Sequence, residues 1–218
     1  MGQSKTEEDY LKAIYTLSRT QPKGVSTKSI GDLLKIKPPT VSDMLRKLGD
    51  KKVIKYARYK GVTLTKEGEK IALKIIRKHR LWETFLVEHF KFKWDEVHDI
   101  AEQLEHIDSP KLVNRLDEYL GFPRFDPHGD PIPDKEGVIA VHHDKTLDQI
   151  SKGQKAVVVG VKDHSAGFLK HLESISITLG TEVEVLQVID YDKSFVVMLD
   201  NKSQRSLSYQ VCKNLLIN

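Results

Sequence analysis

The chain has 218 residues, of which 39% are hydrophobic and 30% are charged, enough for one large domain or two to three small ones. No apolar run approaches the roughly 18 residues of a membrane-spanning helix, and the acidic N-terminal segment has no signal-peptide pattern. A single cysteine, Cys212, excludes an internal disulfide and a zinc ribbon. We therefore expect a soluble cytoplasmic protein without a membrane partner.

Charge is distributed unevenly along the chain. Residues 1–70 hold 16 Lys and Arg against 8 Asp and Glu, whereas residues 71–140 hold 10 against 14 and residues 141–218 hold 9 of each. A basic first third is typical of a protein that binds a polyanion, although charge alone fits a solvated lysine-rich face equally well. Five of the nine histidines lie in the middle third, so metal-type ligands and basic residues are segregated.

The apolar pattern of the first third predicts helices over residues 6–19, 26–34 and 38–48. Two short helices joined by a tight turn are typical of a helix-turn-helix. The outward side chains of its second helix can reach bases or phosphates: Thr40, Ser42, Asp43, Arg46 and Lys47. Lys28, on the preceding helix, joins this candidate DNA-binding set.

Residues 53–64 predict a β-hairpin whose turn contains Arg58 and Lys60. A basic hairpin that follows a helix-turn-helix is the wing of a winged helix. We expect its two basic side chains to contact phosphate or the minor groove. The alternative is an ordinary solvated hairpin, which the preceding motif makes the less favoured interpretation.

Three further helices are predicted over residues 66–89, 94–106 and 109–120. They carry more apolar surface than one small helical module buries, which favours a subunit interface. The candidates for this interface are Ile75, Leu81, Phe85, Leu86, Ile100 and Leu104. We expect a homodimer, whose two-fold symmetry suits a palindromic DNA operator.

The middle third also carries imidazole and carboxylate side chains at helical spacing. His79 and Glu83 are four residues apart, and His98, Glu102, Glu105 and His106 fall within one narrow arc of a helix. Converging carboxylates are costly unless a positive charge sits between them. The pattern therefore predicts a divalent metal site.

The last third changes character after a loop rich in Pro, Gly and Asp over residues 121–137, which contains Asp126 and His128. Short apolar or alternating strands follow at 154–161, 181–189, 194–200 and 206–211, with one helix at 165–175. This pattern is typical of a small SH3-like β-barrel. The fold class is thus mainly α with a small β part, and the predicted domains are residues 1–70, 71–140 and 141–218.

The order of these parts resembles the diphtheria toxin repressor/MntR family of metal-dependent transcription regulators. The resemblance rests on the winged helix, the spacing of the histidines and glutamates between His79 and His106, the PHGDPIP segment and the SH3-like domain. It covers essentially the whole chain, and the C-terminal part looks like the FeoA-type domain of the longer members. It implies a helical dimerisation domain between the two.

The resemblance implies a primary metal site made by Asp9, Glu102, Glu105 and His106. Iron-type members have Met and Cys where this chain has Asp9 and Glu102, whereas manganese-type members have Asp and Glu. An oxygen-rich ligand set suits a harder ion, which favours Mn²⁺ over the alternative, Fe²⁺.

A second metal site is implied by two alternative ligand sets. Iron-type members use the positions of His79, Glu83 and His98. Three-domain manganese-type members use a set that here corresponds to Glu83, Asp126, His128 and Asp163. This chain keeps both sets, so both alternatives stay open.

The function implied is that of a repressor of metal-uptake genes, whose dimer binds a palindromic operator when metal locks the domain arrangement. Pro39, Thr40, Ser42 and Asp43 match the positions that the family uses at the DNA groove, and Arg46 is expected to contact phosphate. Two alternatives remain: a metalloenzyme with a His/carboxylate site, and a metal-independent winged-helix regulator. The first fits poorly, because the sequence has no zinc-hydrolase motif. A di-iron bundle needs a Glu-x-x-His motif on each of two helices, whereas the long helix has only His79 and Glu83, in the reverse order.

Overall fold

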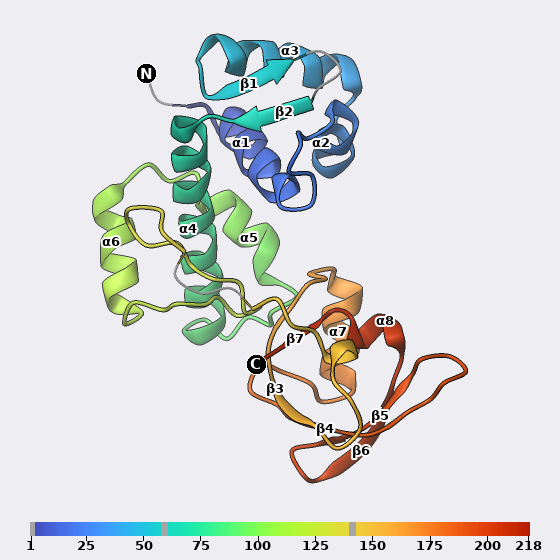
Figure 1. Cartoon of the computed structure of the whole chain (residues 1–218). Helices are drawn as coiled ribbons and strands as arrows, with labels where there is room; N and C mark the ends of the chain where they lie inside the picture. The colour runs from blue at the N-terminus through green and yellow to red at the C-terminus, as the bar shows by residue number, and fades with distance from the viewer. Residues whose placement is uncertain (1–2, 58–60, 140–142) are drawn as a thin grey trace. The chain divides into compact units, whose positions relative to one another are not determined.

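A computed structural model describes residues 3–57, 61–139 and 143–218 (Figure 1). The chain folds into two compact units. The first comprises Met1–His79, Glu102–Pro110 and Pro133–Val138, and the second comprises Arg80–Ala101, Lys111–Ile132 and Ile139–Asn218. No helix among the described residues is long and apolar enough to cross a membrane.

The first unit begins with the winged-helix elements: α1 (Lys5–Ser18), α2 (Thr27–Leu34), α3 (Pro38–Asp50), β1 (Ile54–Ala57) and β2 (Gly61–Leu64). Figure 1 shows the two strands running beside α3 and α1. The strands pair antiparallel, with Ile54 opposite Leu64. The predicted helix-turn-helix and hairpin are confirmed, apart from the hairpin tip at Arg58 and Lys60, which lies outside the described residues.

The start of α1 shows how local chemistry sets an element boundary. Ser4 caps the helix in a capping box with Glu7, in which each side chain accepts a hydrogen bond from the other residue's backbone N–H. The helix therefore begins at Lys5. Apolar side chains of α1 and α3 fill the core of this part: Leu11, Ile14, Val41, Leu45 and Leu48.

The long helix α4 (Lys66–Glu88) starts where Thr65 Oγ1 accepts a hydrogen bond from the backbone N–H of Gly68. Gly68 has no room for a side chain, because a Cβ there would lie 1.9 Å from the carbonyl oxygen of Val53. The helix contributes its first part, up to His79, to the first unit.

The second unit contains the rest of α4, most of α5 (Val97–Leu104) and most of α6 (Pro110–Tyr119). Leu81, Leu116 and Ile132 form a small core there. Ile75, Leu81 and Leu86 are buried within the chain itself. Their prediction as subunit-interface residues is therefore wrong, because the apolar stripe of α4 is covered by the chain's own residues.

A five-stranded antiparallel sheet fills the C-terminal part of the second unit, in the order β6-β5-β4-β3-β7. Its strands are β3 (Lys155–Val161), β4 (Glu182–Val188), β5 (Phe195–Leu199), β6 (Ser203–Leu207) and β7 (Leu215–Ile217). The helices α7 (Ala166–Ser174) and α8 (Tyr209–Cys212) and a 3₁₀ turn, η1 (Leu147–Gln149), accompany it. This is the small SH3-like part of the predicted fold class.

The end of this domain differs from the sequence prediction. The fourth strand ends at Leu207, because Ser208 caps α8 by accepting a hydrogen bond from Val211 N. The strand after it, β7, was not predicted. It has only three residues, too few to display an alternating pattern.

Candidate metal centres and DNA-binding surface

An acidic cluster in the first unit joins α1 to the end of α5. Asp9 lies on α1, whereas Glu105 and His106 lie in the turn that follows α5. One ligand atom from each of these three residues lies within 4.8 Å of the others. His106 Nε2 is 3.1 Å from Asp9 Oδ1, and His106 Nδ1 is 2.7 Å from Glu8 Oε2. Burial raises the pKa of Asp9 above its ordinary value, and His106 and Lys12 oppose that rise.

Lys12, one turn beyond Asp9 on α1, enters the same cluster. Its ammonium lies 2.7 Å from Glu102 Oε1, and 2.6 Å and 2.8 Å from the two carboxylate oxygens of Glu105. Burial by itself would lower the pKa of Lys12, but the charge of Glu105 and the hydrogen bonds to both carboxylates raise it above its ordinary value. Lys12 is therefore a charged group inside the cluster.

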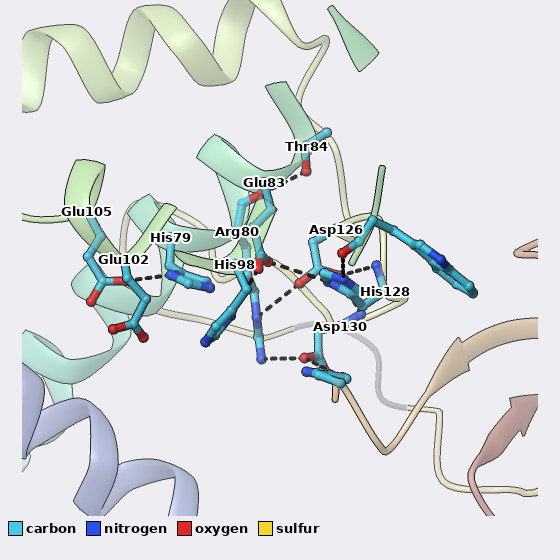
Figure 2. Close-up of polar contacts among 12 residues, drawn as sticks. His79, Arg80, Glu83, Thr84, His98, Glu102, Glu105, Asp126, His128 and Asp130 are labelled. Carbon is cyan, nitrogen blue, oxygen red and sulfur yellow. Dashed lines mark hydrogen bonds and ion pairs between the residues drawn. The ribbon is translucent and has the colours of Figure 1, made fainter. Parts of the chain in front are cut away.

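His79 contacts the same buried carboxylate from α4. Its Nδ1 lies 2.5 Å from Glu105 Oε2, and Figure 2 shows this contact beside Glu102. His79, Glu102 and Glu105 also offer ligand atoms that all lie within 4.8 Å of one another. Glu105 therefore belongs to two neighbouring groups of possible ligands.

The prediction that His98, Glu102, Glu105 and His106 lie on one face of a single helix is wrong in one respect. The helix α5 ends at Leu104, where the N–H of Ile107 turns back to the Leu104 carbonyl. Glu105 and His106 consequently lie beyond the helix. His98 belongs to the second unit, with its Nδ1 3.4 Å from Glu83 Oε1.

A second candidate centre lies wholly within the second unit, where Glu83, Asp126 and His128 are all buried. One ligand atom from each lies within 4.8 Å of the others. His128 Nε2 donates to the backbone carbonyl of Trp94 at 2.7 Å, which leaves Nδ1 as the nitrogen that can bind an ion once it has lost its proton. That Nδ1 is buried without a hydrogen-bond partner among the described residues, 3.7 Å from Glu83 Oε2.

The charges at this second centre perturb one another. Burial and the neighbouring Glu83 raise the pKa of Asp126 to about 7, against the influence of Arg80. Burial by itself would lower the pKa of His128, but the nearby Glu83 carboxylate raises it to about 9. Arg80 reaches both Asp126, at 3.5 Å, and Asp130, at 3.3 Å (Figure 2). Two carboxylates and an imidazole thus face one another with a guanidinium at their edge.

The remaining predicted ligand, Asp163, lies in none of the groups of possible ligands among the described residues. Its Oδ1 accepts a hydrogen bond from Ser165 N at 2.9 Å, just before α7. Its neighbour His164 stacks on His128 with ring centroids 5.1 Å apart and lies 3.6 Å from Asp130. The sequence gives no signal that His164 lies at this site, because no ligand-spaced partner precedes or follows it along the chain.

Most of the candidate DNA-binding residues of α3 are exposed to solvent. Pro39, Thr40, Asp43, Arg46 and Lys47 are exposed and Ser42 is half-buried. Arg46 is 3.4 Å from Asp43, and the Ser42 hydroxyl donates to the Pro38 carbonyl. Lys28, on α2, is also exposed.

Glu7 connects α1 to α3, the helix that carries these exposed residues. Its buried carboxylate lies 3.2 Å from Lys47 and 2.8 Å from Lys51, both on or directly after α3. Burial by itself would raise the pKa of Glu7, but Lys51, the backbone of Ser4 and Lys47 together lower it to about 2. The sequence offered no signal for this contact, because Lys47 and Lys51 follow Glu7 by 40 and 44 residues.

Fold and site together define a winged-helix protein with buried His/carboxylate clusters. Known families match each part. The DNA-binding domain of iron-dependent repressors matches residues 3–62, their metal-binding and dimerisation domain matches residues 65–134, and the FeoA domain matches residues 145–218.

Solved structures and curated relatives agree. A manganese-dependent transcriptional repressor in complex with manganese is 34% identical, with a TM-score of 0.86 over 97% of this chain and 98% of that one. The manganese regulator SloR is 31% identical, with a TM-score of 0.77 over 100% of this chain and 99% of that one. The iron-dependent repressor IdeR of Mycobacterium tuberculosis is 35% identical over 130 residues, 59% of this chain and 55% of IdeR.

This chain belongs to the family of metal-dependent transcriptional repressors that includes the diphtheria toxin repressor, IdeR and SloR. The resemblance seen in the sequence is confirmed. The family consists of DNA-binding repressors that depend on divalent metals, and the names of its members include both iron and manganese.

Proposed function

We propose that this chain is a cytoplasmic repressor of metal-uptake genes that binds an operator as a homodimer when a divalent ion, Mn²⁺ before Fe²⁺, occupies the acidic cluster. One observation carries the proposal. Asp9, on the first helix of the winged-helix part, shares a ligand-sized space with Glu105 and His106, which follow α5. A site built this way couples metal binding to the position of α1.

The donor chemistry of the cluster fits a hard divalent ion. Asp9, Glu102 and Glu105 supply carboxylate oxygens and His106 supplies one imidazole nitrogen, a combination that suits Mn²⁺ and also accepts Fe²⁺. A bound ion supplies the positive charge that lets these carboxylates approach one another. The Nδ1 of His106 faces Glu8, which orients the ring so that Nε2 points toward Asp9.

With an ion bound, the residues of the cluster link α1 to the end of α5, and we call this link the clasp. Asp9 holds α1, whereas Glu102, Glu105 and His106 hold the end of α5. Because α1 packs in one core with α3, fixing α1 also fixes the exposed face of α3. The clasp shifts the population toward the DNA-binding arrangement only by as much as its affinity for the ion differs between arrangements.

For the second site, the observations support the manganese-type set without Asp163. Glu83, Asp126 and His128 are buried together, and Nδ1 of His128, which has no hydrogen-bond partner among the described residues, lies 3.7 Å from Glu83 Oε2. A buried ring nitrogen without a hydrogen-bond partner calls for an explanation, and an ion that replaces its proton supplies one. We assign these three residues to the second ion, and His98 stays an alternative ligand through its contact with Glu83.

The dimer face is proposed to be an aromatic patch of the second unit. The ring centroid of Phe85 lies 5.2 Å from that of His89, 5.0 Å from that of Phe90 and 6.1 Å from that of Tyr119. Phe90 is 63% exposed and Tyr119 is 65% exposed, large values for rings that already cluster. Aromatic side chains in such patches are the ones enriched at subunit interfaces.

The test of the proposal is the variant Asp9→Ala. It removes the ligand on α1 and leaves the DNA-binding face of α3 unchanged. We expect Mn²⁺ binding at the cluster to weaken at least tenfold, and the gain in operator affinity on adding Mn²⁺ to be lost. Asp32→Asn, an exposed acidic residue on α2, is the matched control. Unchanged metal-dependent operator binding in Asp9→Ala would refute the clasp.

A further inference from the structure

The acidic cluster contains two adjacent places for a cation, and both use Glu105. One place is bounded by Asp9, Glu105 and His106, and the other by His79, Glu102 and Glu105. In each, the ligand atoms lie within 4.8 Å of one another. Glu105 is completely buried, so both of its oxygens need positive partners inside the protein.

The second of these places already contains a positive charge. The Lys12 ammonium makes hydrogen bonds of 2.6–2.8 Å to Glu102 and to both oxygens of Glu105. The Lys12 side chain is only 17% exposed, so solvent screens this contact little. Lys12 projects from α1, one turn beyond Asp9, and its position is fixed by the helix.

The formal charge of the cluster agrees with Lys12 occupying the second of the two places. The three carboxylates of the proposed ligand set, Asp9, Glu102 and Glu105, carry a formal charge of about −3, and Lys12 reduces it to about −2. One divalent ion neutralises that remainder, whereas a second ion would leave a surplus of about +2, which Glu8, 2.7 Å from His106, reduces to about +1.

We propose that Lys12 is the resident cation of the cluster. Its ammonium fills the place between Glu102 and Glu105, holds α1 to the end of α5 before metal arrives, and restricts the cluster to a single divalent ion. His79 is then a positioning residue that orients Glu105 through their 2.5 Å contact. This inference rests on the proposed function, because it concerns regulation of the same cluster.

Two variants and one control test the proposal in the full-length chain. Lys12→Met removes the charge and keeps the length of the side chain, Lys12→Glu adds a carboxylate, and Lys5→Met changes an exposed lysine on the same helix. The readouts are the number of Mn²⁺ ions bound per chain, by equilibrium dialysis, and the melting temperature with and without Mn²⁺.

We expect Lys12→Glu to bind one more Mn²⁺ per chain than the unmodified protein. Lys12→Met should melt several degrees lower without metal and gain more from added Mn²⁺, because its carboxylates lack their resident cation. Lys5→Met should match the unmodified protein in both readouts. An unchanged ion count in Lys12→Glu, or an unchanged metal-free melting temperature in Lys12→Met, would overturn the proposal.

The same measurements separate this inference from the proposed function. If Asp9→Ala binds as many ions as the unmodified chain, the clasp fails, while a lower metal-free melting temperature of Lys12→Met still supports the resident cation. If Asp9→Ala loses an ion but Lys12→Glu gains none, the clasp stands and the resident cation fails.

Discussion

At the scale of single residues, a buried carboxylate is stable only when positive charges or hydrogen-bond donors contact it. Glu105 meets the Lys12 ammonium and the His79 imidazole, and Asp126 accepts hydrogen bonds from the backbone N–H groups of His128 and Asp130 at 2.8 Å and 3.0 Å. Each carboxylate is thereby oriented before any ion binds. Such orientation is what a metal site requires of its surroundings.

The neighbouring imidazoles His128 and His164 provide a matched pair at the second site. His128→Ala removes the buried Nδ1, whereas His164→Ala removes a stacked ring that lies beside it. We expect His128→Ala to lose one bound Mn²⁺ per chain and His164→Ala to keep it, as measured by equilibrium dialysis. Equal loss in both variants would contradict the assignment of His128 as the ligand.

The metal-ligand residues could be predicted from the sequence only in part. Asp9, Glu105 and His106 were predicted as partners from the family resemblance, and the structure places their ligand atoms together. Asp163 was predicted as a ligand too, yet its carboxylate accepts from Ser165 N. A hydrogen bond two residues along a loop depends on backbone angles that residue identity alone does not fix.

At the scale of elements, Glu7 ties α1 to α3. Its charged form is favoured in the folded state, because Lys51 and Lys47 contact a carboxylate that is otherwise buried. A folded-state pKa of about 2, lowered from 4.5, means that the stabilisation is present above the unfolded pKa. It is lost as the pH falls from about 4.5 toward 2.

We therefore expect Glu7→Gln to lower the free energy of unfolding at pH 7 by about 2 kcal/mol, discounted because both lysines are partly exposed. The difference from the unmodified protein should shrink steadily between pH 4 and pH 2, in urea unfolding curves. Asp32→Asn, exposed on α2, is the control and should show no such trend. A difference that stays constant with pH would show that packing, and not charge, holds Glu7.

Helices were easier to predict than their ends. The apolar periodicity of α1, α3 and α4 was visible in the sequence, because each turn repeats the same environment. The end of α5 at Leu104 was not visible, since the next two residues are held by contacts with α1 and α4. The short β7 forms only because β3 offers an edge to pair with, and that edge exists only in the folded domain.

At the scale of the whole molecule, the proposed function depends on the association of two chains. Ile75, Leu81 and Leu86, predicted as interface residues of α4, turned out to be interior, whereas Phe85 is half-buried and Phe90 and Tyr119 remain exposed. Burial of an amphipathic helix against its own chain and against a partner gives the same sequence pattern. The order of the three parts was predicted far better than this surface, because each part carries its own motif.

Phe90→Asp tests the proposed dimer face. A charge in the centre of an apolar interface should shift the protein toward monomer at micromolar concentration, measured by sedimentation velocity. Tyr191→Asp is the control, because Tyr191 is 98% exposed and lies outside the aromatic patch. If both variants sediment like the unmodified protein, the dimer forms through another surface.

The most direct test of the whole account is DNA binding titrated with metal. The unmodified chain, stripped of metal with a chelator, is mixed with a duplex selected from random sequences in the presence of Mn²⁺, and the affinity is followed by fluorescence anisotropy. We expect Mn²⁺ to raise the affinity at least tenfold, Fe²⁺ to raise it less strongly, and renewed chelation to reverse the gain. An affinity that no divalent ion changes would contradict it.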